Sequence, residues 1–164
     1  MRLEKAVEDL SSESEAVQRM TEVSGMLQAL DWIHNKNGQP VSFGARGLEE
    51  LETITDTYVI PELKECEFRI ACDVTNTLCG EQGASAVYGP QKGATPSMIM
   101  QMDKWLAYYA ALAKEKFPKA NAKQDGTGAA GGLGFAFLTF TNAVLESGIK
   151  DRTGGDTAGR NISK

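Results

Sequence analysis

Residues 65–76 read ECEFRIACDVTN, and apolar and polar side chains alternate along most of this stretch. Because successive side chains of a strand point to opposite faces of a sheet, the alternation predicts a half-buried strand over residues 66–74. Asp73 lies at the carboxyl end of this strand, and Asn76 follows it. In open α/β sheets, ligands bind outside the carboxyl ends of the strands, so both side chains are candidates for a ligand site. The alternative is an ordinary turn in which Asp73 acts only as a cap.

A long helix is predicted after this strand. Thr95 followed by Pro96 is typical of a helix start, with a hydroxyl cap and a proline at the first helical position. Apolar residues then recur at spacings of three and four, and Pro118 ends the pattern, which gives a helix over about residues 96–116. The apolar stripe consists of Met98, Met102, Trp105, Leu106, Tyr109, Leu112, Ala113 and Phe117.

Shorter elements are predicted around these two. The first thirty residues carry an apolar stripe typical of helices. Asn37-Gly38 predicts a hairpin turn, and residues 47–54 predict a short helix. Another helix is predicted from Leu133 to about residue 146.

Composition limits the classes of protein that need consideration. The chain has 164 residues, 41% of them hydrophobic, and a net charge of −5, which is typical of a soluble globular protein. The acidic balance argues against nucleic acid or an anionic membrane as a partner. The chain begins without a secretory signal, and we expect a cytoplasmic protein. Three cysteines without a CxxC pair predict reduced thiols and no resident metal site.

Two glycine-rich stretches remain open to two interpretations each. CGEQGASAVYGPQKGATP, residues 79–96, presents Lys92 either as an ordinary solvated lysine or as a positive charge that contacts phosphate beside a helix start. GTGAAG, residues 126–131, fits a dinucleotide-binding pattern literally, but no strand precedes it. It is either a closely packed linker into a helix or an anion site at the helix N-terminus. With Asp73, these features suggest phosphoryl transfer.

Three blocks in this order resemble the bacterial glycerate kinase family. They are CDVTNTLCGEQGA (72–84), YGPQKGATP (88–96) and GAAGGLG (128–134), and the family patterns are close to CDVTNPLCGPQGA, FGPQKGATP and GAAGGLG. The resemblance covers about residues 25–149. Thr77 and Glu81 depart from it, since the family tends to have proline at both positions.

The resemblance implies an α/β, helix-rich fold that is an incomplete part of a two-domain architecture, one domain flavodoxin-like and the other restriction-endonuclease-like. Members of the family are at least twice as long, so a truncated central segment is expected. Residues 1–24, which do not resemble the family, are expected to form an amphipathic helical extension, and the composition of residues 150–164 predicts a disordered tail. An incomplete sheet leaves an unpaired edge, which predicts either a homo-oligomer or an N-terminal helix that shields this edge.

The resemblance also implies an activity: ATP and glycerate give phosphoglycerate and ADP, with Mg²⁺ as cofactor. Asp73 is the candidate base or metal-linked carboxylate, and Lys92 the second candidate catalytic residue. The candidate binding residues are Asn76, Thr95, Gly128, Gly131, Gly132 and Gly134. The chain alone is expected to be weak or inactive. The alternative is a non-catalytic remnant, or an interaction module that needs a partner to complete the cleft.

Overall fold

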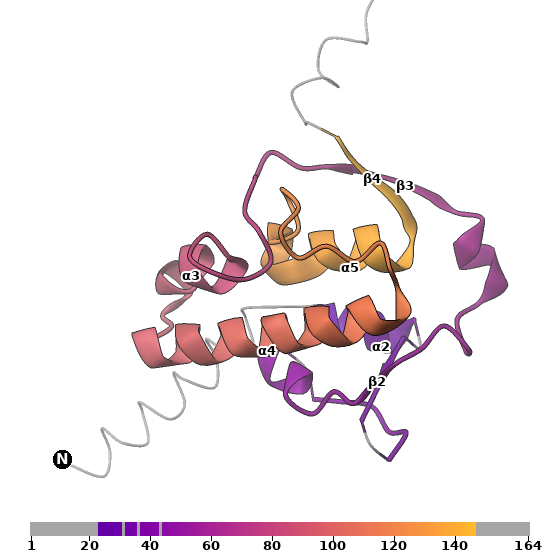
Figure 1. The fold of residues 1–164 in the computed structure, drawn as a ribbon, viewed down its shortest axis with the longest axis horizontal. Helices are drawn as coiled ribbons and strands as arrows, with labels where there is room; N and C mark the ends of the chain where they lie inside the picture. Colours follow the sequence, from indigo (N-terminus) through magenta and orange to yellow (C-terminus); the bar gives the residue numbers. More distant parts are fainter. Residues whose placement is uncertain (1–22, 31, 36, 43, 147–164) are drawn as a thin grey trace, which may run out of the picture.

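The computed structural model describes residues 23–30, 32–35, 37–42 and 44–146, which form a helix-rich α/β structure with two small sheets (Figure 1). The helices are α2 (Val23–Ala29), α3 (Ala84–Tyr88), α4 (Pro96–Lys116) and α5 (Leu133–Phe140). The strands are β1 (Ile33–His34), β2 (Thr53–Ile54), β3 (Glu67–Ala71) and β4 (Asn142–Glu146). Four 3-10 turns complete the set: η1 (Ala45–Leu48), η2 (Pro61–Lys64), η3 (Pro90–Lys92) and η4 (Ala129–Gly132). The predicted tail lies outside the described residues, as does all of the predicted extension before Val23.

The long helix α4 confirms the sequence prediction over its full range. Thr95 Oγ1 accepts a hydrogen bond from the backbone N–H of Met98 at 3.4 Å, and Pro96 occupies the first turn. At the other end Phe117 is extended, with φ −117° and ψ 92°. A proline disfavours the helical conformation of the residue before it, so Pro118 explains this ending. The buried face consists of Met98, Met102, Leu106, Tyr109, Ala110 and Ala113.

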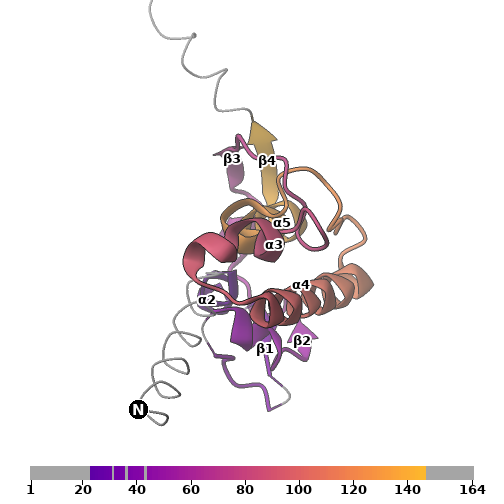
Figure 2. The ribbon, with the colours of Figure 1, turned by 90° about the vertical axis from the view of Figure 1, so that its left-hand side faces the viewer.

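The core lies on both sides of α4. Figures 1 and 2 show α5 alongside α4, the β3–β4 sheet beyond α5, and the β1–β2 pair on the opposite side of α4. Aromatic rings fill the interior: the ring centroids of Trp32 and Phe140 are 5.0 Å apart, and those of Tyr109 and Phe135 are 5.2 Å apart. Apolar burial between these layers is the main favourable term that holds the segments together.

The two sheets differ in direction. β3 and β4 are parallel, with Glu67 opposite Asn142 and Ala71 opposite Glu146. Parallel neighbours need a long crossover connection, and here it contains α3, α4 and α5. One face of the sheet packs on α5, where the ring of Phe68 lies 5.4 Å from that of Phe137. β1 and β2 form the second sheet and are antiparallel.

Three local predictions are wrong or only partly right. The strand predicted over residues 66–74 is β3, which ends at Ala71. Residues 47–54 are not one helix, since η1 ends at Leu48 and β2 follows. The turn at Gly38 forms, with φ 68°, but β1 pairs with β2 and not with the segment directly after the turn.

The helix predicted from Leu133 to about residue 146 is also wrong, because α5 ends at Phe140 and β4 follows. Thr141 turns back on the helix end, and its hydroxyl donates to the Phe137 carbonyl at 2.8 Å. Residues 142–146 then gain hydrogen bonds from β3, which is distant in the sequence. Tertiary pairing has overridden the local helical pattern here.

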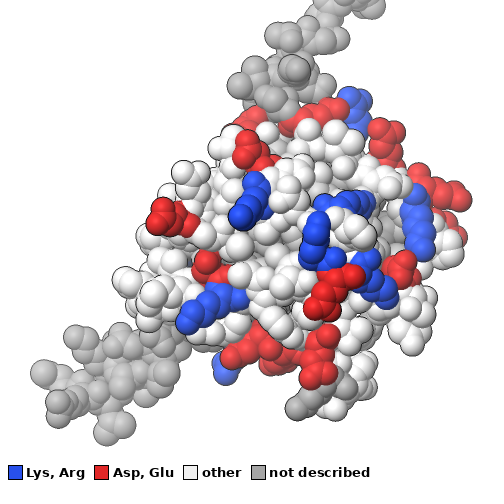
Figure 3. Space-filling view, viewed as in Figure 1, with Lys and Arg blue, Asp and Glu red and all other residues white. Residues whose placement is uncertain are grey.

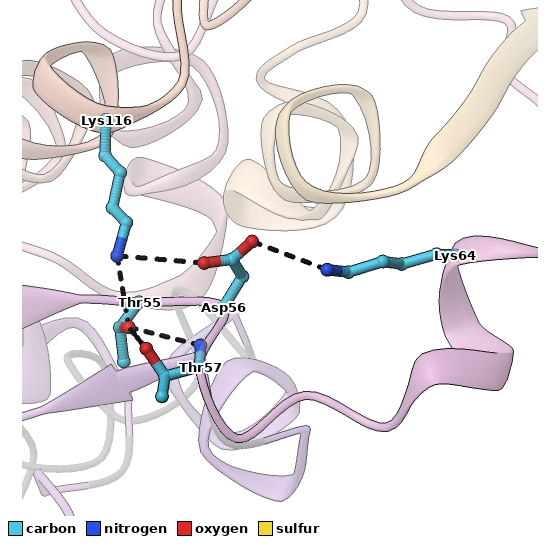
Figure 4. Close-up of polar contacts among 5 residues, drawn as sticks. All are labelled: Thr55, Asp56, Thr57, Lys64 and Lys116. Atoms are coloured by element: carbon cyan, nitrogen blue, oxygen red, sulfur yellow. Dashed lines mark hydrogen bonds and ion pairs between the residues drawn. The ribbon is translucent and has the colours of Figure 1, made fainter.

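A polar cluster ties the loop after β2 to the end of α4 (Figure 4). The Asp56 carboxylate lies 3.6 Å from Lys64 Nζ and 3.7 Å from Lys116 Nζ, and Lys116 Nζ also donates to Thr55 Oγ1 at 3.1 Å. These side chains are partly exposed, so each ion pair contributes about 0–1 kcal/mol. Acidic and basic side chains are intermixed across the face seen in Figure 3. Among the described residues, none of the helices combines the length and apolar character needed to cross a bilayer.

Candidate functional site

The three motif blocks, residues 72–84, 88–96 and 128–134, meet at Asn76. Its carboxamide oxygen accepts a hydrogen bond from the Tyr88 hydroxyl at 2.8 Å, which joins the first block to the second. Its backbone carbonyl accepts from the Gly128 N–H at 2.9 Å, which joins the first block to the third. Its side-chain Nδ2 donates to the Gln82 carbonyl at 3.3 Å. One residue therefore links segments that are far apart in the sequence, and we call this set of contacts the Asn76 junction.

Close backbone packing explains the glycines of the third block. A Cβ atom on Gly128 would stand 2.2 Å from the Thr77 carbonyl oxygen. A Cβ on Gly134 would stand 2.1 Å from the Gly126 carbonyl oxygen. Contacts this short do not occur in folded proteins, so both positions require glycine or a displaced backbone. The close packing predicted for this glycine-rich segment is thereby confirmed, while a role in anion binding stays a prediction.

A left-handed turn precedes α5. Ala130, Gly131 and Gly132 have φ angles of 48°, 69° and 109° in succession, and α5 begins at the next residue. Ala130 is the one described non-glycine residue with a positive φ. A left-handed conformation costs an L-residue about 1–2 kcal/mol, so the surrounding contacts must stabilise this turn. The turn brings the start of α5 next to Leu78, whose Cδ1 lies 3.0 Å from the position of a Cβ on Gly132.

The two candidate catalytic residues lie on segments held by the Asn76 junction. Asp73 is exposed on the loop after β3, three residues before Asn76. Lys92 is exposed at the end of η3, four residues after Tyr88. Thr95 lies further along, where its hydroxyl caps α4. The structure therefore gives Thr95 a capping role, and its part in ligand binding stays a prediction, as do the roles of Asp73 and Lys92.

The sequence did not single out two side chains that hold this region. Tyr88 supplies the hydroxyl of the Asn76 junction. Asp103, from the middle of α4, accepts a hydrogen bond from the Gly80 N–H at 2.8 Å and so holds the loop of the first block. Both bonds join residues that local periodicity cannot pair. One signal for Tyr88 was available in the sequence. The family pattern has phenylalanine at this position, so the hydroxyl of Tyr88 is an addition to it.

The Cys79 thiol in the first block is disfavoured as a nucleophile. Burial raises the pKa of the Cys79 thiol, and the nearby Asp103 carboxylate raises it further. A raised pKa disfavours the thiolate, which is the nucleophilic form of cysteine. Within the described residues, no three side chains of the His, Cys, Asp and Glu types gather to hold a metal ion.

Comparisons of this chain with known proteins agree on one family. The model of the glycerate kinase family matches residues 23–151. Glycerate 2-kinase of Escherichia coli (strain K12) is 43% identical over 128 residues, which are 77% of this chain and 34% of that protein. Glycerate kinase of Haemophilus influenzae is 42% identical over 127 residues, with 77% and 34% covered. The chain thus spans about a third of the length of the curated relatives it matches.

A solved structure agrees with these relatives. A crystal structure described as that of a glycerate kinase 2 from Salmonella typhimurium LT2 superposes with a TM-score of 0.75 at 41% identity. The superposition covers 83% of this chain and 37% of that one. The structural likeness therefore extends over most of this chain and over little more than a third of the neighbour.

Proposed function

The chain belongs to the glycerate kinase family, and we propose that it carries part of a site that transfers a phosphoryl group from ATP to glycerate, giving phosphoglycerate and ADP. The observation that carries the proposal is the Asn76 junction, which gathers the three motif blocks at one place. Because the chain spans about a third of its relatives, the activity of a whole protein is part of the proposal. A cytoplasmic location, where ATP is available as the donor, is part of the same proposal.

Asp73 and Lys92 have the central chemical roles in this proposal. The Asp73 carboxylate accepts the proton of the attacking glycerate hydroxyl, or holds a cation beside the phosphates. The Lys92 ammonium contacts phosphate oxygens as a positive charge. Both side chains are exposed to solvent, and so they are accessible to small anions.

The binding roles fall to residues of the three blocks. Asn76 and the glycine turn before α5 contact the glycerate or the nucleotide, and Thr95 lies at the edge of the site. The glycine positions assigned to binding are Gly128, Gly131, Gly132 and Gly134. At Gly131, Gly132 and Gly134 backbone N–H groups, and not side chains, would meet the ligand, whereas the Gly128 N–H already donates to the Asn76 carbonyl and holds the glycine turn in place.

Mg²⁺ fits this donor set as an ion that arrives with the nucleotide. Magnesium commonly binds one or two carboxylates together with substrate phosphates and keeps several waters. Asp73 supplies one carboxylate, and a dedicated cluster of three ligands is absent from the described residues. When bound, the ion would neutralise phosphate charge. The contribution of this chain is then to hold Asp73 at a fixed place relative to the glycine turn.

The direct test is ADP release from ATP by the folded 164-residue chain, with and without D-glycerate and Mg²⁺. A third of the relatives' length supplies only part of a cleft, so we expect glycerate-dependent turnover to be weak or undetectable with the chain alone. Turnover should rise when the remaining two thirds of a family member is added as a separate polypeptide. A folded chain that neither turns over nor binds ATP or glycerate under any of these conditions would contradict the proposal.

Replacing Lys92 with alanine tests the phosphate contact. Charge-assisted hydrogen bonds are worth about 1.5–3 kcal/mol, so we expect the affinity for MgATP to fall at least tenfold. The measurement is calorimetric or fluorescence titration of the nucleotide. Lys104→Ala is the matched control, because Lys104 is an exposed lysine on α4 and its loss removes the same charge. Equal affinities in both variants would return Lys92 to the role of an ordinary surface lysine.

A second function is favoured by the small size of the β3–β4 sheet. Two parallel strands alone are unusual, because parallel sheets are normally larger and buried on both faces. Val144 on β4 is 51% exposed. The chain is then a non-catalytic remnant or an interaction module, and the sheet edge pairs with a partner or with a second copy in a homo-oligomer. Sedimentation of the chain, alone and with the remaining family polypeptide, distinguishes these states.

A further inference from the structure

The Asn76 carboxamide has a defined orientation because of its two hydrogen-bond partners. Nδ2 lies 3.3 Å from the backbone carbonyl of Gln82, and a carbonyl can only accept a hydrogen bond. The nitrogen must therefore face Gln82 and the oxygen must face Tyr88. The Tyr88 hydroxyl, 2.8 Å from Oδ1, is then the donor. A flipped carboxamide would place Oδ1 against the Gln82 carbonyl, where two acceptors cannot form a hydrogen bond, so the bond to Gln82 fixes the orientation.

The same bond connects the two segments that carry the charged candidates. Tyr88 is the last residue of α3, and η3 with Lys92 follows directly. Asn76 lies on the loop that carries Asp73. The Tyr88 side chain is half-buried and packs against the apolar residues of the core, so its ring is fixed independently of its hydroxyl. The hydroxyl therefore holds the loop after β3 in a fixed position relative to α3.

We propose that Tyr88 is a positioning residue: its hydroxyl orients the Asn76 carboxamide and fixes the second motif block against the first, in which the Asn76 backbone carbonyl binds the third. The orientation of the Asn76 carboxamide does not depend on the proposed function. Only the use of this arrangement in ligand binding rests on it. Because Oδ1 accepts from Tyr88, Asn76 meets a ligand as a donor through the second N–H of Nδ2. A donor at this position suits an anionic oxygen, such as that of a carboxylate or a phosphate.

The Gly128 N–H reports on this arrangement, because it donates to the backbone carbonyl of Asn76 at 2.9 Å and is buried. In Tyr88→Phe the ring remains and only the hydroxyl is lost. We expect hydrogen exchange at the Gly128 amide to become about fivefold faster, the ratio that one net hydrogen bond sustains. The side-chain Nδ2 resonances of Asn76 should also shift and broaden in the NMR spectrum.

Tyr108→Phe is the matched control. Tyr108 also donates its hydroxyl to the chain, to the Leu51 carbonyl at 3.1 Å, but from α4 and away from the Asn76 junction. Both variants lose one tyrosine hydroxyl and one hydrogen bond. We expect Tyr108→Phe to leave the Gly128 exchange rate and the Asn76 resonances unchanged. A purely structural role of Tyr88 would instead raise exchange at all core amides together.

The outcomes separate this proposal from the proposed function. Faster exchange at Gly128 and altered Asn76 resonances in Tyr88→Phe alone support the positioning role. Unchanged values in Tyr88→Phe, or a uniform increase over the whole core, would overturn it. Binding of MgATP or D-glycerate to the unsubstituted chain is measured separately. Failure of that binding counts against the proposed function, while the exchange measurement still decides the role of Tyr88.

Discussion

Replacing Gly128 with alanine should lower the free energy of unfolding by about 3 kcal/mol, the upper end of the usual cost of overpacking. The new Cβ would stand 2.2 Å from the Thr77 carbonyl oxygen and 3.1 Å from the Asn76 carbonyl oxygen. Both are backbone atoms, which cannot rotate away as a flexible side chain can. The first and third motif blocks must therefore separate, and the Asn76 junction opens. Chemical denaturation of the two proteins measures the difference.

The backbone conformation of Gly128 allows the loss of stability to be assigned to a single cause. Its φ of −79° and ψ of −7° are accessible to any L-residue, so the loss comes from the contact alone. Gly93→Ala is the opposite case, because Gly93 has a φ of 82° but no atom within 4 Å of the new Cβ. Gly93→Ala should cost about 1–2 kcal/mol through backbone strain and leave the Asn76 junction intact. A Gly128→Ala protein as stable as the original would show that the two blocks are not packed as described.

The sequence predicted the elements whose causes are local. Thr95, Pro96 and Pro118 are within one turn of the ends that they define, and the apolar stripe of α4 repeats along a single segment. Such signals depend on neighbours in the chain, so no knowledge of the rest of the fold was needed. The half-buried character of β3 followed in the same way, whereas the helix-rich α/β class was implied by the resemblance to the glycerate kinase family.

The errors occur where distant segments decide the structure. Residues 142–146 carry no strong strand pattern, and they form β4 because β3 lies beside them. The same holds for β2, which pairs with β1 across an intervening loop and turn. A pattern confined to a short window cannot report a partner outside that window. The predicted helices at residues 47–54 and beyond Phe140 failed for this reason.

For the candidate site, the sequence identified the blocks but not the contacts among them. Asn76 was singled out as a ligand-binding residue, yet its two structural bonds, to Tyr88 and to Gly128, join it to other blocks. The glycines were open to two interpretations because a missing side chain fits both a ligand and a neighbouring backbone. Cβ atoms on Gly128 and Gly134 would collide with backbone oxygens of the protein, and that fact is available only from the fold.

Phe135→Ala should have the largest effect on stability, a loss of about 3–5 kcal/mol, as for other fully buried aromatic residues. The Phe135 side chain is 0% exposed, and its ring lies 5.2 Å from that of Tyr109. Its backbone N–H also donates to the Thr127 carbonyl at 3.1 Å, which places the ring directly behind the glycine turn. Because small domains are stable by only about 5–15 kcal/mol, denaturant should unfold this variant at a much lower concentration.

Tyr109→Phe changes the same ring pair, but we do not expect it to lower the free energy of unfolding. The Tyr109 hydroxyl is fully buried without a hydrogen-bond partner among the described residues, and burial raises its pKa well above the usual range. An unsatisfied buried hydroxyl costs about 1–3 kcal/mol, so its removal should leave stability unchanged or increase it. Together the two variants separate ring volume, which the core requires, from polarity, which it does not. A clear loss of stability in Tyr109→Phe would mean that the hydroxyl has a partner, such as a buried water, and that this part of the core is not purely apolar.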